Sequence, residues 1–453
     1  MSATETSLSP AVASRAAPAA ARLRDGRRVV ALAPLLGMAL LVACAFTAYS
    51  RSFASIPIIE RRHSVLGDAD AANFALLLRD FSLRRTYGNP YQAHNRSLGD
   101  NAQKHKIHHL LYAMVGGPLD AALRSVGFAP DRALYSVNAL IGCLNLLLLA
   151  LLLRRVDQFG SPVLPFLLLY AAALSTWVIT SVPESWPFSG TLVLLYLLLL
   201  DRRPRAAVAG AVLGVFMLNN IYLTVLVVLV PVGFWRAGLP LRRALAAGVR
   251  AGVVALGVWA LCLTALSFFD PSLRPDEFIR FTLWFKRFTQ ENLPPWALYP
   301  WKSAFTNLFI SSIVSNQPDP AIPQDALLVT LRQSRLGLAA TALYVALAAV
   351  ALVGAVRRLG GGRVAVRLAA AVRDSGSELW IWCVAMLVWT VVVFYQSGFL
   401  YSTVVTPCIV ALLYRNLDLR ARAPRLLFYT FLAVMLVNNT LQVLAFRAAL
   451  LRM

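Results

Sequence analysis

Long apolar runs recur along this sequence and restrict its fold more than any other feature. One of them covers residues 336–356 and ends at the pair Arg357-Arg358. A helix needs about 20 apolar residues to cross the hydrocarbon core of a bilayer. Hydrophobic residues make up 58% of the chain and charged residues only 14%, whereas soluble domains carry about 25% charged residues. The sequence therefore predicts an all-α polytopic membrane protein, and it argues against a soluble enzyme, a fibrous protein or a disordered chain.

The apolar runs predict about 11 transmembrane helices. They lie at 29–49, 131–153, 162–182, 186–200, 251–269, 336–356, 379–395, 399–414 and 426–446, with two short helices in a hairpin within 206–235. Residues 1–28 are rich in Ala and Ser and end in arginines, so they are expected to form a disordered cytoplasmic tail. Residues 29–453 are expected to form a single transmembrane domain.

The first apolar run admits two other interpretations. It could be a cleaved signal peptide, and Leu41-Val42-Ala43-Cys44 resembles a lipoprotein cleavage box. The run stays apolar beyond Cys44 and is long enough to span a bilayer, which favours an uncleaved helix.

The placement of arginine predicts which way the helices run. The chain has a formal net charge of +22, which in a soluble protein could suggest a nucleic-acid partner. Here the short connections alternate, and those on one side carry arginine: 154–155, 202–205, 236–250, 357–373 and 415–425. The connections on the other side contain no Lys or Arg: 183–185, 219–220 and 396–398. Arginine-rich connections stay in the cytoplasm, so the amino terminus is predicted to be cytoplasmic and no nucleic-acid partner is expected.

Two long loops are predicted on the outer face, at about 50–130 and 270–335. Long loops in a compact protein are usually functional. All 5 histidines of the chain lie in the first loop, whereas the predicted spans contain almost no ionisable residue. An ion or proton pathway would normally place charges inside the membrane, so polar chemistry is expected at the outer surface.

An acidic motif lies between the first span and the next predicted helix. Phe74, Leu77, Leu78 and Phe81 repeat at helical spacing and predict an amphipathic helix over 71–85. Asp70 could be the N-cap of that helix. Asp68 is not needed as a cap, and a carboxylate at this position could serve as a general base.

A basic segment follows in the same loop. It contains Lys104, His105, Lys106, His108 and His109. On a helix, His105 shares a face with His108 and His109. A metal site is one interpretation and contact with lipid phosphates is another, but the only nearby acid is Asp100. Binding of a phosphate or a sugar is favoured over a metal, because charged Lys and His side chains offer only donors.

Glu184 is the only charge in the turn 183–185. It could cap the helix that begins near 186, or it could line a site, where it would bind sugar hydroxyls or hold a histidine.

The second outer loop predicts an interfacial helix over 276–288. Phe278, Phe281, Phe285 and Phe288 form one apolar stripe, which is expected to face acyl chains. The basic residues Arg280, Lys286 and Arg287, with Lys302, could then clamp a lipid phosphate. The alternative is a lid without chemistry.

Together these features resemble the GT-C glycosyltransferases. That superfamily of integral membrane enzymes includes protein O-mannosyltransferases, lipid A aminoarabinose transferases and many polyprenol-dependent bacterial transferases. The local likenesses are Gly67-Asp68-Ala69-Asp70, the stretch 105–112, Pro183-Glu184-Ser185 and Phe399-Leu400-Tyr401-Ser402. The two outer loops and their interfacial helices extend the likeness over nearly the whole chain.

The resemblance implies an inverting glycosyltransferase that takes its sugar from a polyprenyl-phosphate donor. The acceptor would be a hydroxyl of a glycan, lipid or protein, and no cofactor or metal is required. Asp68 matches the acidic position that serves as general base, with Asp70 as the second candidate. The enzyme would be a multi-pass protein of the bacterial cytoplasmic (inner) membrane, with its active site on the outer face and the bilayer as its surroundings.

Two other functions remain open on the sequence. A lipid or polysaccharide transporter or flippase would show intramembrane charges, or discontinuous helices with repeats; only the break near Asn219-Asn220 favours it, and no internal repeat is visible. An O-antigen ligase or polymerase would place key Arg and His residues in the late loop, but residues 270–335 contain no His.

Overall fold

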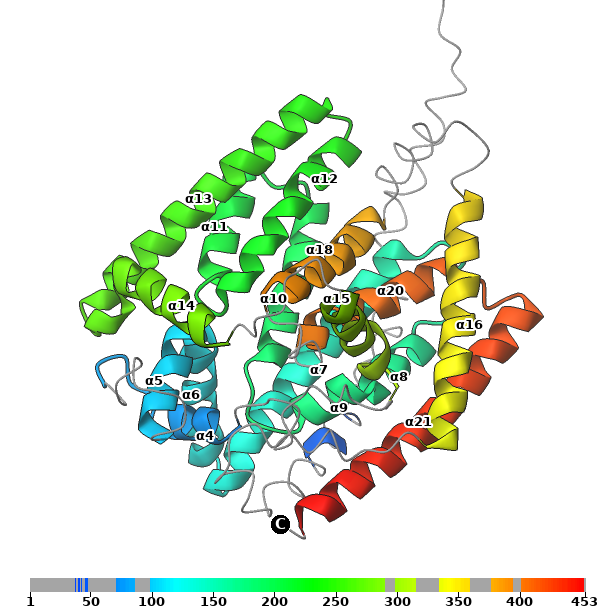
Figure 1. Cartoon of the computed structure of the whole chain (residues 1–453), viewed down its shortest axis with the longest axis horizontal. Coiled ribbons are helices and arrows are strands. Elements are labelled where there is room, and N and C mark those ends of the chain that lie inside the picture. Colours follow the sequence, from blue (N-terminus) through cyan, green and yellow to red (C-terminus); the bar gives the residue numbers. More distant parts are fainter. Residues whose placement is uncertain are drawn as a thin grey trace, which may run out of the picture.

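The computed structural model describes residues 71–85, 98–289, 298–314, 334–358, 376–393 and 401–451, with a few isolated positions between 37 and 47. Every regular element in these ranges is a helix and none is a strand (Figure 1). Four helices are long and apolar enough to cross a membrane: α7 (Pro130–Val156), α13 (Leu241–Ser267), α16 (Arg335–Arg358) and α21 (Arg422–Leu450). The prediction of an all-helical chain suited to a lipid bilayer is thus confirmed.

The total number of spans stays a prediction. Both the tail 1–28 and the turn 396–398 lie outside the described residues, and so does nearly all of the first predicted span, 29–49. The remaining spans are shorter helices than the four above. They are α8 (Leu164–Ala172), α9 (Leu174–Thr180), α10 (Trp186–Asp201), α11 (Ala206–Phe216), η2 (Ile221–Val228), α12 (Leu229–Arg236), α18 (Ser377–Val393), η7 (Ser402–Val404) and α20 (Thr406–Asn416). The predicted hairpin within 206–235 is present, because α11 and η2 meet at a turn over 217–220.

Two predicted spans differ from the structure. Residues 162–182 form two helices, because the backbone of Ala173 is extended, with ψ of 134°. Helix α13 begins at Leu241 rather than at 251, directly after Pro240. Hydropathy placed the start of the predicted span just after Arg250. Arginine favours the helical conformation, so the helix extends through Arg250 toward its amino-terminal end.

Small residues set the spacing between α11 and α13. A Cβ atom added to Gly210 would lie 2.3 Å from the carbonyl oxygen of Ala251, and one added to Gly214 would lie 2.5 Å from that of Ala255. The pair Gly210 and Gly214 has the small-xxx-small spacing by which membrane helices approach closely. Side chains larger than glycine at either position would push the two helices apart.

Ion pairs join the ends of α7, α10 and α12 and the start of α18. Arg236 at the end of α12 forms ion pairs with Glu378 of α18, at 2.6 Å, and with Asp201 of α10, at 3.4 Å. Asp201 also pairs with Arg155 of α7. We call this group of four residues the arginine end.

Shorter helices cover the opposite end. From the first predicted loop come α4 (Ala71–Arg79), α5 (Leu98–His108) and α6 (Leu110–Ser125). The second contributes η3 (Pro271–Leu273), α14 (Pro275–Thr289), α15 (Leu298–Phe305) and η4 (Thr306–Ser311). In Figure 1, α4, α5 and α6 lie together, and α14 lies above them beside α13. The predicted amphipathic helix over 71–85 is shorter than expected, because α4 ends at Arg79.

Candidate functional site

Three histidines gather where α5 meets α6. The ring of His109, in the turn between the helices, stacks on that of His105 with centroids 6.0 Å apart, and it lies 6.3 Å from the ring of His108. Phe74 of α4 contacts the same group, with its ring 4.9 Å from His105 and 5.4 Å from His109. The predicted common face of the three histidines is therefore present and is covered by α4.

A chain of hydrogen bonds links His109 to the turn 183–185. The Oγ atom of Ser185 lies 2.9 Å from Nδ1 of His109 and donates to Oε1 of Glu184 at 3.2 Å. The same Oε1 accepts the backbone N–H of Ser185 at 2.7 Å. We call this chain the His109–Ser185–Glu184 relay. Glu184 thus accepts a backbone N–H at the start of α10, as a cap would, and Ser185 links it to His109, whereas its predicted binding of sugar hydroxyls stays a prediction.

Buried polar side chains fix the two elements that carry the relay. Tyr112 of α6 donates its hydroxyl hydrogen to Oδ1 of Asn138 at 2.8 Å, and Nδ2 of Asn138 donates to the carbonyl oxygen of Glu184 at 2.7 Å. Asn219 accepts the backbone N–H of Tyr112 at 2.9 Å and donates to Ser189 at 2.9 Å. The Asn219-Asn220 break thus supports α6 and the start of α10.

An aromatic cluster adjoins the relay. Trp186 lies 6.2 Å from His109 and 4.6 Å from Tyr401, measured between ring centroids. Tyr222 of η2 stacks near Trp186 at 6.4 Å and contacts Trp389 at 5.4 Å. Tyr401 belongs to the predicted 399–402 motif, so this motif, the turn 183–185 and the His105–Tyr112 stretch lie together. We call this region the histidine end.

The histidine end and the arginine end are far apart. Helix α10 begins at Trp186 and ends at Asp201, and its 15 steps of about 1.5 Å separate these residues by roughly 22 Å. The turns 183–185 and 219–220 therefore lie at the opposite end from the ion pairs of Arg155 and Arg236.

The predicted bases Asp68 and Asp70 lie outside the described residues. The helix that follows them, α4, packs against α5 and α6. Its residue Phe74 also lies 5.4 Å from the ring of Tyr112. The chain that carries both aspartates therefore continues directly into an element of the histidine end.

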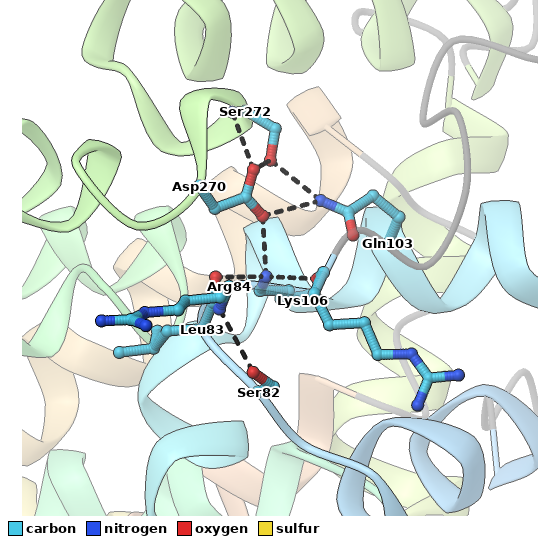
Figure 2. A network of polar contacts seen from close by, with 8 residues as sticks. Ser82, Leu83, Arg84, Gln103, Lys106, Asp270 and Ser272 are labelled. Atoms are coloured by element: carbon cyan, nitrogen blue, oxygen red, sulfur yellow. Dashed lines mark hydrogen bonds and ion pairs between the residues drawn. The ribbon is translucent and has the colours of Figure 1, made fainter.

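Lys106 joins the two predicted outer loops (Figure 2). Its ammonium group donates to Asp270 at 2.7 Å and to the carbonyl oxygens of Leu83 and Arg85 at 3.0 and 2.9 Å. The side chains of Lys106 and Asp270 are 0% and 2% exposed. An ammonium has three hydrogens, so none is left for a phosphate. Contrary to the prediction, Lys106 is placed as a structural residue rather than a ligand-binding one.

Asp270 is held ionised by its neighbours. Burial by itself raises its pKa, but hydrogen bonds from Lys106 and Ser272 outweigh this and bring the pKa below its usual range. Ser272 donates through both its hydroxyl, at 2.8 Å, and its backbone N–H, at 2.9 Å. Gln103 donates to both Asp270 and Ser272, so the ion pair lies within a connected polar group.

His108 lies beside α14, with its ring 4.9 Å from that of Phe281. Burial, followed by the nearby His109, Lys104 and His105, lowers the pKa of His108 well below its usual value, which favours the neutral ring. Lys104 is partly exposed. The substrate-binding roles predicted for His108 and Lys104 stay predictions.

Helix α14 faces the protein with part of its predicted lipid stripe. Phe278 and Phe281 are buried, and Phe278 packs against Trp259 of α13 at 5.2 Å. This part of the prediction is wrong, because Phe278 packs against Trp259 of α13 and Phe281 against His108 of α5. Arg280 is 74% exposed and lies 3.7 Å from Glu277. The side chains of Phe285, Lys286, Arg287 and Phe288 lie outside the described residues.

Within the described part of the chain, no group of three or more His, Cys, Asp or Glu side chains is placed to hold a metal ion. No protein-family model matches this chain, and no curated protein or solved structure is significantly similar to it. The resemblance to the GT-C glycosyltransferases therefore rests on the residues of the chain itself.

Several residues at or close to the histidine end were not predicted as site residues: Tyr112 as an anchor, Asn138, Trp186, Tyr222 and Asp270. Ser185 and Asn219 were named only as members of a motif and of a helix break. Asn138 carried a signal, since a polar side chain inside a predicted span is usually functional or structural. Asp270 carried none, because its partner Lys106 is 164 positions away in the sequence.

Proposed function

We propose that this protein is a membrane glycosyltransferase that moves a sugar from a polyprenyl-phosphate donor to an acceptor hydroxyl. The reaction takes place at the histidine end, which we assign to the outer face of a bacterial cytoplasmic membrane. The observation that carries the proposal is the convergence of the His105–Tyr112 stretch, the turn 183–185 and Tyr401 at one end of the bundle. These are three of the four segments on which the resemblance rests, and the chain after the fourth, which holds Asp68, leads into the same end.

The proposed chemistry is a single displacement with inversion. The acceptor hydroxyl loses its proton to the carboxylate of Asp68, with Asp70 as the second candidate. The acceptor oxygen bonds to the anomeric carbon while the bond from that carbon to the phosphate oxygen breaks. The polyprenyl phosphate leaves as a monoester, and fixed cations stabilise its charge. Lys104 and the basic residues of α14, Arg280, Lys286 and Arg287, are the candidates for that task.

The lipid that copurifies with the full-length protein tests this function. Mass spectrometry of that lipid is expected to find a polyprenyl phosphate bearing a single sugar, enriched over the membrane from which the protein was taken. Incubation of the protein and this lipid with membranes lacking the protein should release polyprenyl phosphate and glycosylate an acceptor. A polyprenyl diphosphate glycan would point instead to a ligase or polymerase, and absence of any polyprenyl lipid together with absence of transfer would reject the proposal.

A transporter is the second candidate, and the break between α8 and α9 favours it. Nδ2 of Asn439 donates to the carbonyl oxygens of Ala172 and Ile313, both at 2.8 Å. The backbone N–H of Ser175 donates to the carbonyl oxygen of Ser312 at 2.9 Å. Broken helices of this kind often line transport paths, yet hydrogen bonds close this one. Movement of the copurified lipid across liposomes with its sugar intact would support transport over transfer.

A further inference from the structure

The single hydrogen of the Ser185 hydroxyl determines how His109 is protonated. A serine hydroxyl has one hydrogen to donate, whereas an ionised carboxylate can only accept. Because Ser185 Oγ lies 3.2 Å from Oε1 of Glu184, its hydrogen belongs between these two oxygens. The same Oγ then has only lone pairs to offer to Nδ1 of His109, 2.9 Å away. With the serine hydrogen directed at the carboxylate, the stronger acceptor, the hydrogen of the second bond comes from the imidazole; with the serine hydrogen directed at His109, Nδ1 would be the unprotonated nitrogen instead.

A neutral imidazole carries one hydrogen, on one nitrogen or the other. If Nδ1 donates to Ser185, then Nε2 is the unprotonated nitrogen and accepts hydrogen bonds. A phosphate oxygen also only accepts, so it does not suit this nitrogen. A hydroxyl group does, because it can donate. In this tautomer, His109 would therefore favour a sugar hydroxyl over a phosphate, the two ligands that the sequence left open for this segment.

We propose that Glu184 and Ser185 are positioning residues that hold His109 as the neutral Nδ1–H tautomer, so that Nε2 accepts a hydrogen bond from a substrate hydroxyl. This inference rests on the proposed function, since the sugar and its acceptor supply the hydroxyl groups. His109 lies between the ring of Phe74 and that of Trp186, a setting suited to the apolar face and polar edge of a sugar. Among the described residues, the titratable groups in contact with His109 include His105, His108 and, through Ser185, Glu184.

The tautomer can be observed without a substrate. The full-length protein, labelled with isotopes at histidine and embedded in lipid nanodiscs near neutral pH, is examined by solid-state NMR, and His109→Gln identifies the signals of His109. The expected spectrum has the hydrogen on Nδ1 and none on Nε2. Ser185→Ala should shift His109 toward the other tautomer. Ser181→Ala is the matched control, because Ser181 lies at the same turn but donates to the carbonyl oxygen of Trp177, and it should leave the His109 signals unchanged.

Transfer kinetics test the role of that tautomer. Loss of a partner that orients a functional histidine typically reduces activity by about 10–100-fold, so Ser185→Ala should lower kcat by this factor in the transfer assay described above, whereas Ser181→Ala should not. A wild-type spectrum with the hydrogen on Nε2, or on both nitrogens, would overturn the proposal. So would an unchanged kcat in Ser185→Ala. If the wild-type protein shows the Nδ1–H tautomer but transfers no sugar, the proposed function is rejected. The substrate hydroxyl as partner of Nε2 is then rejected too, whereas the assignment of the tautomer is supported.

Discussion

The arginine end and the histidine end differ in what their polar side chains contact. At the arginine end, Arg236 meets carboxylates of two other helices, Asp201 and Glu378. At the histidine end, His109 meets a hydroxyl and aromatic rings, and the carboxylate of Glu184 accepts two hydrogen bonds from Ser185. Charges paired across helices hold the helices together. Neutral groups that both donate and accept can exchange a protein partner for a ligand.

This comparison assigns different consequences to substitutions at the two ends. Changes at the arginine end should affect stability and leave transfer unchanged. Changes at the relay and in the chain before α4 should affect transfer and leave stability unchanged. The Lys106–Asp270 pair is the exception, because it is a buried ion pair close to the histidine end.

The largest effect is expected from Asp68→Asn. An amide cannot accept the acceptor proton, and general base catalysis is worth about 10²–10⁴-fold in rate. Transfer should fall by that factor while expression and melting temperature stay as in the wild type. Asp70→Asn is the control. Full activity of Asp68→Asn beside an inactive Asp70→Asn would move the base to Asp70, and full activity of both would remove this segment from the mechanism.

The next effect is on stability, from Lys106→Met. Removal of one partner of a buried ion pair leaves the other charge uncompensated and costs about 3–5 kcal/mol. The melting temperature of the purified protein in detergent should fall accordingly. The double variant Lys106→Met/Asp270→Leu should recover much of the loss, because no charge remains buried. If the single and double variants melted alike, the ion pair would not be the cause of the loss.

The same pair predicts a limit to stability in acid. The pKa of folded Asp270 is below its unfolded value, so its contribution is fully present above the unfolded pKa, about 3.9. That contribution is lost as the pH falls through the lower, folded value. Melting temperatures should therefore drop below about pH 4 in the wild type, and less steeply in Asp270→Asn. Equal slopes in the two proteins would assign acid sensitivity to other groups.

Sequence reasoning succeeded where a contact depends on neighbours along the chain. It placed α16 at 336–356, and the helix covers Arg335–Arg358. It also placed the turn between α11 and η2 and the turn 183–185 that precedes α10. It missed α13 before residue 251, because hydropathy treats arginine as a boundary although it is a good helix former. The small-xxx-small spacing of Gly210 and Gly214 is visible in the sequence, but it was not used to predict the close approach of α11 and α13.

Contacts between distant segments could not be predicted in this way. Nothing in a single sequence indicates that Asp270 and Lys106 form a pair. Whether Phe278 and Phe281 face the protein or the lipid depends on whether α13 or acyl chains lie beside them. The spacing of apolar residues gives the apolar side of a helix, but it does not give the partner that covers that side. The relay required the position of Ser185 relative to His109, which the packing of both α6 and α10 against α7 provides.

At the arginine end, Glu378→Gln should lower stability by about 1–3 kcal/mol, the cost of leaving a buried partner of Arg236 weakly satisfied. Transfer activity below the melting temperature should stay as in the wild type. Asp418→Asn, in an exposed pair with Arg420, is the control and should change neither quantity. Loss of turnover in Glu378→Gln without loss of stability would break the division of roles between the two ends.

The smallest effect is expected from Arg280→Ala, and it decides whether α14 contributes to donor binding. The sequence placed Arg280 at a lipid phosphate, where a charge-assisted hydrogen bond would be worth about 1.5–3 kcal/mol. The structure leaves its side chain 74% exposed beside Glu277, and exposed pairs contribute about 0–1 kcal/mol. Donor KM should therefore rise by less than about 5-fold, which corresponds to about 1 kcal/mol. Arg274→Ala provides the baseline, since Arg274 is similarly exposed and paired with Asp276. A rise of about 10-fold or more in Arg280→Ala alone, at about 1.4 kcal/mol, would show that the donor reaches α14 and would extend the histidine end to this helix.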